Sequence, residues 1–199
     1  MSSRTANVGH LRPHVRLGAV LAIGIAAGLV TWLVRTGDGS NTSGSSSAHE
    51  QVAAVNASGL RTMSRALGQP IYWAGPVSGD TYELTRAGDG RIYVRYLPPG
   101  EKVGTSKALL TVGTYPVAHA LSATQGASSR GDSAHVPVGG GGVAFYDRRA
   151  PTSVYVAYPG AGYQIEVYDP SAAAARRLVS SGRTCDSARC WRSASPQAW

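Results

Sequence analysis

Hydrophobic residues are spread unevenly along this chain, and the longest apolar run lies near its beginning. Residues 17–34, LGAVLAIGIAAGLVTWLV, contain no charge and are flanked by Arg16 and Arg35. A helix of this length measures about 27 Å, close to the roughly 30 Å hydrocarbon core of a bilayer. The run therefore predicts one transmembrane helix. A buried core helix is the alternative, and the arginine at each end argues against it.

The charges around this run predict its orientation. It is preceded by Arg4, Arg12 and Arg16, and Arg35 follows it. The positive-inside rule then places residues 1–16 in the cytoplasm and the rest of the chain outside the plasma membrane. A cleaved signal peptide is the alternative, but it usually has a shorter apolar region with small residues soon after it. We therefore expect an uncleaved, single-pass signal anchor in contact with the lipid bilayer.

Gly24 and Gly28 form a GxxxG motif inside the apolar run. Small residues also occur in single spans for no packing reason, so the motif alone does not predict a dimer. Because small residues at this spacing let two transmembrane helices approach closely, a homodimer through the span is the alternative to a monomer. A dimerising span would suit a subunit of a larger membrane complex.

Beyond the span, the pattern changes from a polar stretch to short alternating segments. The stretch is rich in Gly, Ser and Thr and cannot bury enough apolar surface to fold, so we expect a flexible tether. The predicted parts are a cytoplasmic tail (1–16), the span (17–34), the tether (35–57), an extracytoplasmic domain (58–182) and a C-terminal tail (183–199).

The clearest alternation occurs over residues 80–86 and 91–96. Their apolar faces coincide when Tyr82 pairs with Tyr96, which leaves a three-residue loop that ends in Gly90. Such a loop favours glycine at its last position, because the backbone is left-handed there. The two segments therefore predict a β-hairpin.

Other segments complete the predicted domain. The fold class is α+β, a mainly antiparallel sheet with two or three helices on one face, preceded by one transmembrane helix. The helices are expected to begin at Ser58, Pro116 and Asp169, and the further strands to cover residues 109–115, 143–146, 154–158 and 163–168.

The net charge is less informative than its value of +8 suggests. Residues 1–35 carry four Arg and no acid. Half of the net positive charge therefore belongs to the predicted span and its cytoplasmic tail, where it reflects membrane orientation. Residues 36–199 carry 13 Arg and two Lys against 11 acids, which leaves a mildly basic domain. Nucleic acid is not expected as a partner. An envelope protein or an anionic envelope polymer is the expected partner.

The two cysteines, Cys185 and Cys190, lie close together near the C-terminus. Two thiols without nearby histidines do not make a zinc site, which needs four ligands. Outside the cytoplasm such a pair is expected to form a disulfide.

The sequence carries no strong catalytic motif, and neither a cofactor nor a metal is expected. A phosphate-binding loop and a GxSxG motif are both missing from it. An envelope hydrolase or transferase with a non-standard site stays open as an alternative. It would have to bring His119 or His135 together with Asp132 or Glu166, within hydrogen-bond reach.

A weak candidate binding site lies on one predicted strand, where Arg91, Tyr93 and Arg95 alternate on the outer face. Such a row can bind phosphate or sugar groups through charge and ring stacking. The alternative is an ordinary solvated face on which Glu83 neutralises Arg95, or a face covered by a helix.

Four segments carry a family resemblance: QPIYWAGP (69–76), YELT with GRIYVRYLPPG (82–100), TVGTYP (111–116) and YQIEVYDPSAAAARRLV (163–179). They resemble a family of uncharacterised single-pass membrane proteins of high-GC actinobacteria. The resemblance covers about residues 60–180 and implies an N-terminal span in the same place. It implies no activity and no functional residues. The leading expectation is therefore a non-enzymatic binding or interaction module of the cell envelope.

Overall fold

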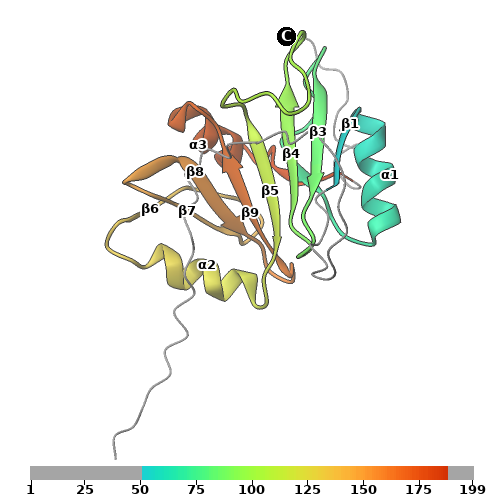
Figure 1. Ribbon diagram of the computed structural model, residues 1–199. Helices are drawn as coiled ribbons and strands as arrows, with labels where there is room; N and C mark the ends of the chain where they lie inside the picture. Colours follow the sequence, from blue (N-terminus) through green and yellow to red (C-terminus); the bar gives the residue numbers. More distant parts are fainter. Residues whose placement is uncertain (1–50, 188–199) are drawn as a thin grey trace, which may run out of the picture. The chain divides into compact units, whose positions relative to one another are not determined.

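The computed structural model describes residues 51–187, which fold into two antiparallel sheets and three helices. The larger sheet has eight strands in the order β1-β3-β4-β5-β9-β8-β7-β6, and Figure 1 shows them side by side. Every strand pairing within this part of the chain is antiparallel. The prediction of an α+β fold built on a mainly antiparallel sheet is confirmed.

The strands of the larger sheet are β1 (Gln51–Val55), β3 (Thr81–Arg86), β4 (Ile92–Leu97), β5 (Thr111–Pro116), β6 (Ser133–His135), β7 (Val143–Asp147), β8 (Ala150–Ala157) and β9 (Tyr163–Tyr168). The smaller sheet pairs β2 (Tyr72–Trp73) with β10 (Cys185–Asp186). The helices are α1 (Ala57–Leu67), α2 (Ala120–Ser128) and α3 (Ala172–Ser180).

The predicted hairpin forms in the expected register. Tyr82 pairs with Tyr96 across β3 and β4, and the loop between them ends in Gly90 at a φ of 84°. Neighbouring β8 and β9 pair so that Val156 faces Ile165, which brings their apolar faces together. In both hairpins one buried face specifies the register, because a slip of one residue would turn every apolar side chain outward.

One face of the large sheet carries the main hydrophobic core. Central strands supply alternate residues to it: Ile92, Val94, Val112, Val154, Val156, Ile165 and Val167. Leu60 of α1 and Ala175 and Val179 of α3 cover these residues and are fully buried. The small sheet closes the same face, where Trp73 packs edge-on against Tyr82 at 5.6 Å between ring centres. Burying a large apolar side chain contributes about 1.5–3 kcal/mol, so this face supplies most of the stability.

The second face is covered in part by α2. Gln164 alternates with the core residue Ile165 along β9, and its side-chain amide donates a hydrogen bond to the Thr124 hydroxyl of α2 at 2.8 Å. The buried positions of α2 are small residues such as Ala120 and Ala127, which lets the helix lie close to the strands. The prediction of two or three helices on one face holds for α1 and α3 and is wrong for α2.

Each helix begins at a different residue from the one predicted. Asn56, not Ser58, caps α1, because its side chain accepts a hydrogen bond from the Gly59 backbone. Ser171 caps α3 in the same way, two residues after Asp169. Pro116 ends β5, and α2 begins four residues later. Asn, Ser and Asp all cap well, so local preference alone does not choose between near neighbours.

The folded part is longer than predicted at both ends. β1 lies inside the expected tether (35–57) and pairs with β3 over five residues. β10 lies beyond residue 182 and pairs Cys185 with Trp73. The predicted disulfide partner, Cys190, is outside the described residues, so that bond stays a prediction.

The predicted span (17–34), with Gly24 and Gly28, also falls outside the part of the chain that the structure describes. Between residues 51 and 187, no helix has the length and apolarity that crossing a membrane requires. Orientation and dimerisation through the span therefore remain predictions.

Candidate functional site

The open part of the second face brings together residues from four neighbouring strands. Tyr93 of β4 pairs with Gly113 of β5, Gly113 pairs with Glu166 of β9, and Glu166 pairs with Tyr155 of β8. Tyr115 lies two residues beyond Gly113 on the same face. We refer to Tyr93, Tyr115, Tyr155 and Glu166 as the tyrosine face.

Glu166 lies at the centre of the tyrosine face and is held by two phenols. The Tyr115 hydroxyl donates a hydrogen bond to carboxylate oxygen Oε2. The Tyr155 hydroxyl donates to the other oxygen, Oε1, at 3.3 Å. The carboxylate is half-buried. Because hydrogen bonds to a charged acceptor are the stronger kind, the three side chains fix one another's orientation.

Tyr115 can take up this position because residue 113 is a glycine. A methyl group at Gly113 would lie 2.8 Å from the Tyr115 hydroxyl oxygen and 2.9 Å from two of its ring carbons. The phenol end of the ring therefore lies flat over the glycine backbone. Tyr93 stands beside it, with ring centres 5.8 Å apart and planes at 83°. The result is a flat ring with an upright ring at its edge.

The phenols of the tyrosine face act as donors at neutral pH. Burial raises the pKa of Tyr115 and of Tyr155, and the negative charge of Glu166 raises both further. Burial also raises the pKa of Tyr93, with a smaller opposing effect from the charge of Arg91. These hydroxyls stay protonated, so they can hold an acceptor in place but do not supply a phenolate nucleophile.

The side chain of Arg95, one member of the predicted row, makes contacts that stabilise the fold. Its guanidinium donates to the backbone carbonyls of Thr105 and Lys107 and lies 3.4 Å from a carboxylate oxygen of Glu83. Glu83 in turn accepts a hydrogen bond from the Gly104 backbone at 2.6 Å. The Arg95 side chain is 19 % exposed and the Glu83 side chain 9 %. Together they fasten the loop of residues 98–110 against the sheet.

Arg91, at the other end of that row, is paired as well. Its Nε atom lies 2.6 Å from a carboxylate oxygen of Asp89, in the hairpin loop, and its side chain is 48 % exposed. Tyr93 is the member of the row that joins the tyrosine face. The alternative weighed from the sequence was a solvated face on which Glu83 neutralises Arg95. The pairing agrees with this geometry, but Glu83 is buried and not solvated.

The residues of the hydrolase hypothesis lie apart. His119 is exposed at the start of α2, and Asp132 is paired with Arg149 at 2.9 Å. His135 is on the same face as Glu166 but three strands away, which separates the two backbones by about 14 Å. Within residues 51–187, no group of three His, Cys, Asp or Glu side chains could hold a metal ion.

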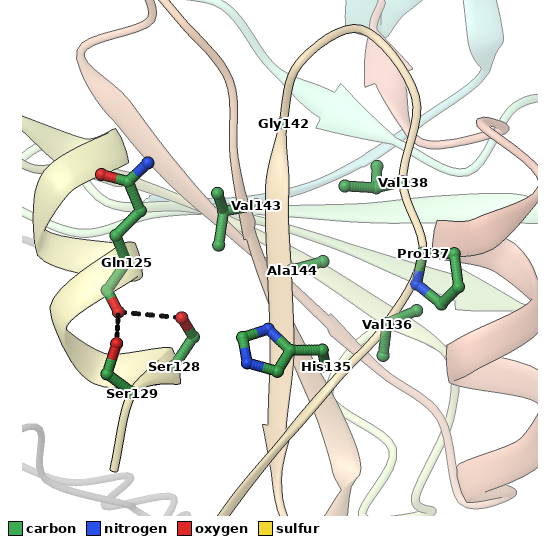
Figure 2. A pocket seen from close by; sticks show the side chains of 10 residues that line it. All are labelled: Gln125, Ser128, Ser129, His135, Val136, Pro137, Val138, Gly142, Val143 and Ala144. Atoms are coloured by element: carbon green, nitrogen blue, oxygen red, sulfur yellow. Dashed lines mark hydrogen bonds between the residues drawn. The ribbon is translucent and has the colours of Figure 1, made fainter.

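A shallow pocket of about 380 Å³ lies between the end of α2 and strands β6 and β7. Figure 2 shows the His135 ring in it, beside Ser128 at the end of α2, with Val138 and Val143 among the apolar lining residues. The hydroxyls of Ser128 and Ser129 both donate to a backbone carbonyl of α2. The pocket therefore offers an imidazole and an apolar wall, with the Gln125 side chain also in its lining.

Sequence reasoning placed Tyr93 in a candidate binding row and named Glu166 only for the hydrolase alternative, and it missed Tyr115 and Tyr155. Two signals were available. The chain has ten Tyr and one Phe, an excess of aromatic rings that carry a hydroxyl. Gly113 interrupts the strand TVGTYP, and an isolated glycine inside a strand often marks a close approach by another group. Neither signal identifies which strands come together.

Comparison with known proteins adds no relative. No protein-family model, no curated protein and no solved structure matches this chain. The resemblance to actinobacterial single-pass membrane proteins therefore stays a prediction.

Proposed function

We propose that this protein is a membrane-anchored, non-enzymatic binding module of the cell envelope, and that the tyrosine face is its binding surface. The observation that carries the proposal is the arrangement around Glu166, whose carboxylate accepts hydrogen bonds from Tyr115 and Tyr155. All four residues of this surface are partly exposed. They are therefore fixed by the protein and still accessible to a ligand.

Preorganisation supports binding. A surface whose side chains are already ordered loses little conformational entropy when a partner arrives. The tyrosine face is built on four paired strands and not on loops, so its rings are held by the sheet itself. The phenols are protonated donors, and His135 is out of reach of Glu166, which argues for recognition and against acid–base chemistry here.

The membrane anchor of this proposal rests on the sequence. The uncharged run at 17–34, with three arginines before it, supports a single span with the N-terminus in the cytoplasm. Residues 51–187 would then face the cell exterior, joined to the span by a short Gly- and Ser-rich tether. Protease added to intact cells should digest this part of the chain. Full protection of residues 51–187 would contradict the orientation.

Binding can be tested with the full chain in detergent micelles and isolated envelope material from the cells that produce it. The intact protein should sediment with the envelope, and Tyr93→Ala with Tyr115→Ala should abolish this. Tyr163→Ala is the matched control, because Tyr163 is half-buried on the opposite face of β9 and outside the core cluster. Equal sedimentation of all three proteins would overturn the proposal.

A further inference from the structure

We infer that the tyrosine face binds an uncharged carbohydrate, with a sugar ring stacked on Tyr115 and its hydroxyls bonded around Glu166. This inference rests on the proposed function and names the chemical class of its ligand. Three features lead to it: the pairing of the nearby charges, the flat ring beside an upright one, and the hydrogen-bonding capacity left at the centre.

The nearby arginines are already paired with carboxylates of the protein. Arg91 is paired with Asp89, and Arg95 with Glu83. An anionic polymer would have to displace a carboxylate from each arginine before it could bind there. The same pairing weakens the case for the anionic partner that the sequence alone suggested.

Charge alone does not select a simple cation either. Burial raises the pKa of Tyr93, the positive charge of Arg91 opposes this rise in part, and the negative charge of Glu166 adds to it. An ammonium group placed between Tyr93 and Tyr115 would meet charges of both signs. A neutral ligand avoids the displacement of Asp89 and depends on neither charge.

The ring geometry suits a sugar. Tyr115 lies flat over Gly113, so one face of the ring is against the backbone and the other is directed away from the sheet. The face of an aromatic ring is electron-rich and attracts weakly positive C–H groups, which line the flat side of a pyranose. The Tyr93 ring stands at 83° to the Tyr115 ring. It would contact one edge of the bound sugar and so limit where the sugar can lie.

The centre of the site complements hydroxyl groups. Tyr115 and Tyr155 each donate a hydrogen bond to Glu166 and keep their protons. Tyr93 is a further hydrogen-bond partner of the Tyr115 hydroxyl, and Ser153 of the Tyr155 hydroxyl. Each phenol oxygen has two lone pairs, so at least one on each can accept a hydrogen bond from a ligand. The half-buried carboxylate also has lone pairs beyond those that the two phenols use. A sugar hydroxyl donates one proton, and a row of them on one ring would match this cluster of acceptors.

Gly113→Ala provides a selective test, because it replaces none of the four residues of the tyrosine face. The added methyl would overlap the Tyr115 ring, so the ring must leave its flat position. The backbone of Gly113 is not in the left-handed region, so alanine itself causes no strain there. Tyr115→Ala removes the ring, and Tyr115→Phe keeps it while losing the bond to Glu166.

The experiment measures binding of the full chain, in micelles, to immobilised uncharged oligosaccharides built from glucose, galactose, mannose, arabinose or N-acetylglucosamine. At least one should bind, and 0.5 M salt should change its affinity by less than about twofold because no ion pair is involved. Gly113→Ala and Tyr115→Ala should each weaken binding by about tenfold or more. Tyr163→Ala should have no effect. If Gly113→Ala lowers the melting temperature sharply, Tyr115→Ala and Tyr115→Phe decide the outcome.

Several results would overturn the inference. One is failure of every oligosaccharide to bind, and another is salt-sensitive binding of heparin or polyphosphate that Tyr115→Ala removes. Binding of tetramethylammonium in place of sugars would assign the face to a cation. In each case the proposed function stands if the intact protein still sediments with envelope material and the tyrosine variants do not. Both ideas fall if the tyrosine variants sediment as the intact protein does.

Discussion

The two faces of the large sheet differ in what holds them together, although they share the same strands. Ile165 and Glu166 are neighbours on β9 and point to opposite faces. Ile165 is fully buried among apolar side chains, whereas Glu166 is half-buried and held by hydrogen bonds from two tyrosines. The core face is stabilised by apolar burial, which has no preferred direction. The tyrosine face depends on directed hydrogen bonds and on the absence of a side chain at Gly113, which makes room for the Tyr115 ring.

This difference suggests a division between stability and recognition. Loss of an apolar side chain from the core face should destabilise the whole domain. Loss of a hydroxyl or a carboxylate from the tyrosine face should disturb the positions of a few side chains and leave the fold intact. Matched substitutions on the two faces therefore test this division.

The largest expected contrast is between Ile165→Ala and Glu166→Gln. The first opens a cavity in the core and should lower the free energy of unfolding by about 2–5 kcal/mol. The second keeps the size of the side chain and should lower it by about 1 kcal/mol or less. Urea denaturation of the two variants measures both values. Equal destabilisation would show that the tyrosine face is part of the structural core.

A second contrast separates the two arginines of β4. Arg95→Ala leaves the buried Glu83 carboxylate without its cation and removes two bonds to the 98–110 loop. We expect a loss of about 1–3 kcal/mol and faster proteolysis within that loop. Arg91→Ala breaks an exposed pair and should cost less than about 0.5 kcal/mol. Similar values for both variants would mean that Arg95 does not fasten the loop.

A third contrast compares hydroxyls on the two faces. The Tyr96 hydroxyl accepts a hydrogen bond from the Ala74 backbone at 2.7 Å and donates to the Gly75 carbonyl at 2.9 Å. Tyr96→Phe leaves a buried N–H without a partner, which should lower the free energy of unfolding by about 1–3 kcal/mol. Tyr155→Phe removes a longer bond at a partly exposed site and should cost about 0.5 kcal/mol. A larger effect for Tyr155→Phe would reverse the comparison.

The smallest expected effect on stability at neutral pH comes from tyrosine ionisation. It applies to both faces and becomes measurable only in alkaline solution. Burial raises the pKa of Tyr96 on one face and of Tyr115 on the other, while unfolded tyrosine ionises near pH 10. Their contribution to stability is therefore fully present below pH 10 and declines as the pH rises above it. The decline should reach up to about 1.4 kcal/mol per pH unit for each tyrosine. In urea denaturation between pH 9 and 11, Tyr96→Phe and Tyr115→Phe should each reduce this slope. An unchanged slope in both variants would contradict the assigned burial.

The sequence predicts local pairings of this fold well. The β3–β4 and β8–β9 hairpins join neighbouring strands, so alternation and loop length determine their registers. Local pattern also underestimates the folded region, because QVAAV at 51–55 follows a polar stretch and gains its partner only from β3. The small buried residues of α2, such as Ala120 and Ala127, give no apolar stripe that would assign it to a face.

The tyrosine face could not be assembled from the sequence for a related reason. Gly113 meets Glu166 because β5 pairs with β9, and α2, β6, β7 and β8 lie between these strands along the chain. Alternation indicates which side of a strand a residue occupies but not which distant strand lies next to it. Tyr93 could be named from the sequence because its whole row lies on one strand. The contacts of Arg95 with the 98–110 loop could not, because they join residues that no local pattern connects.

The most direct measurement is hydroxyl-radical footprinting of the full chain in micelles, with and without isolated envelope material. If the tyrosine face is the binding surface, Tyr93, Tyr115 and Tyr155 should be oxidised more slowly when the envelope is present. Tyr146 and Tyr163, on the opposite face, should be oxidised at an unchanged rate. Protection of those two tyrosines, with none at Tyr93, Tyr115 and Tyr155, would contradict the account.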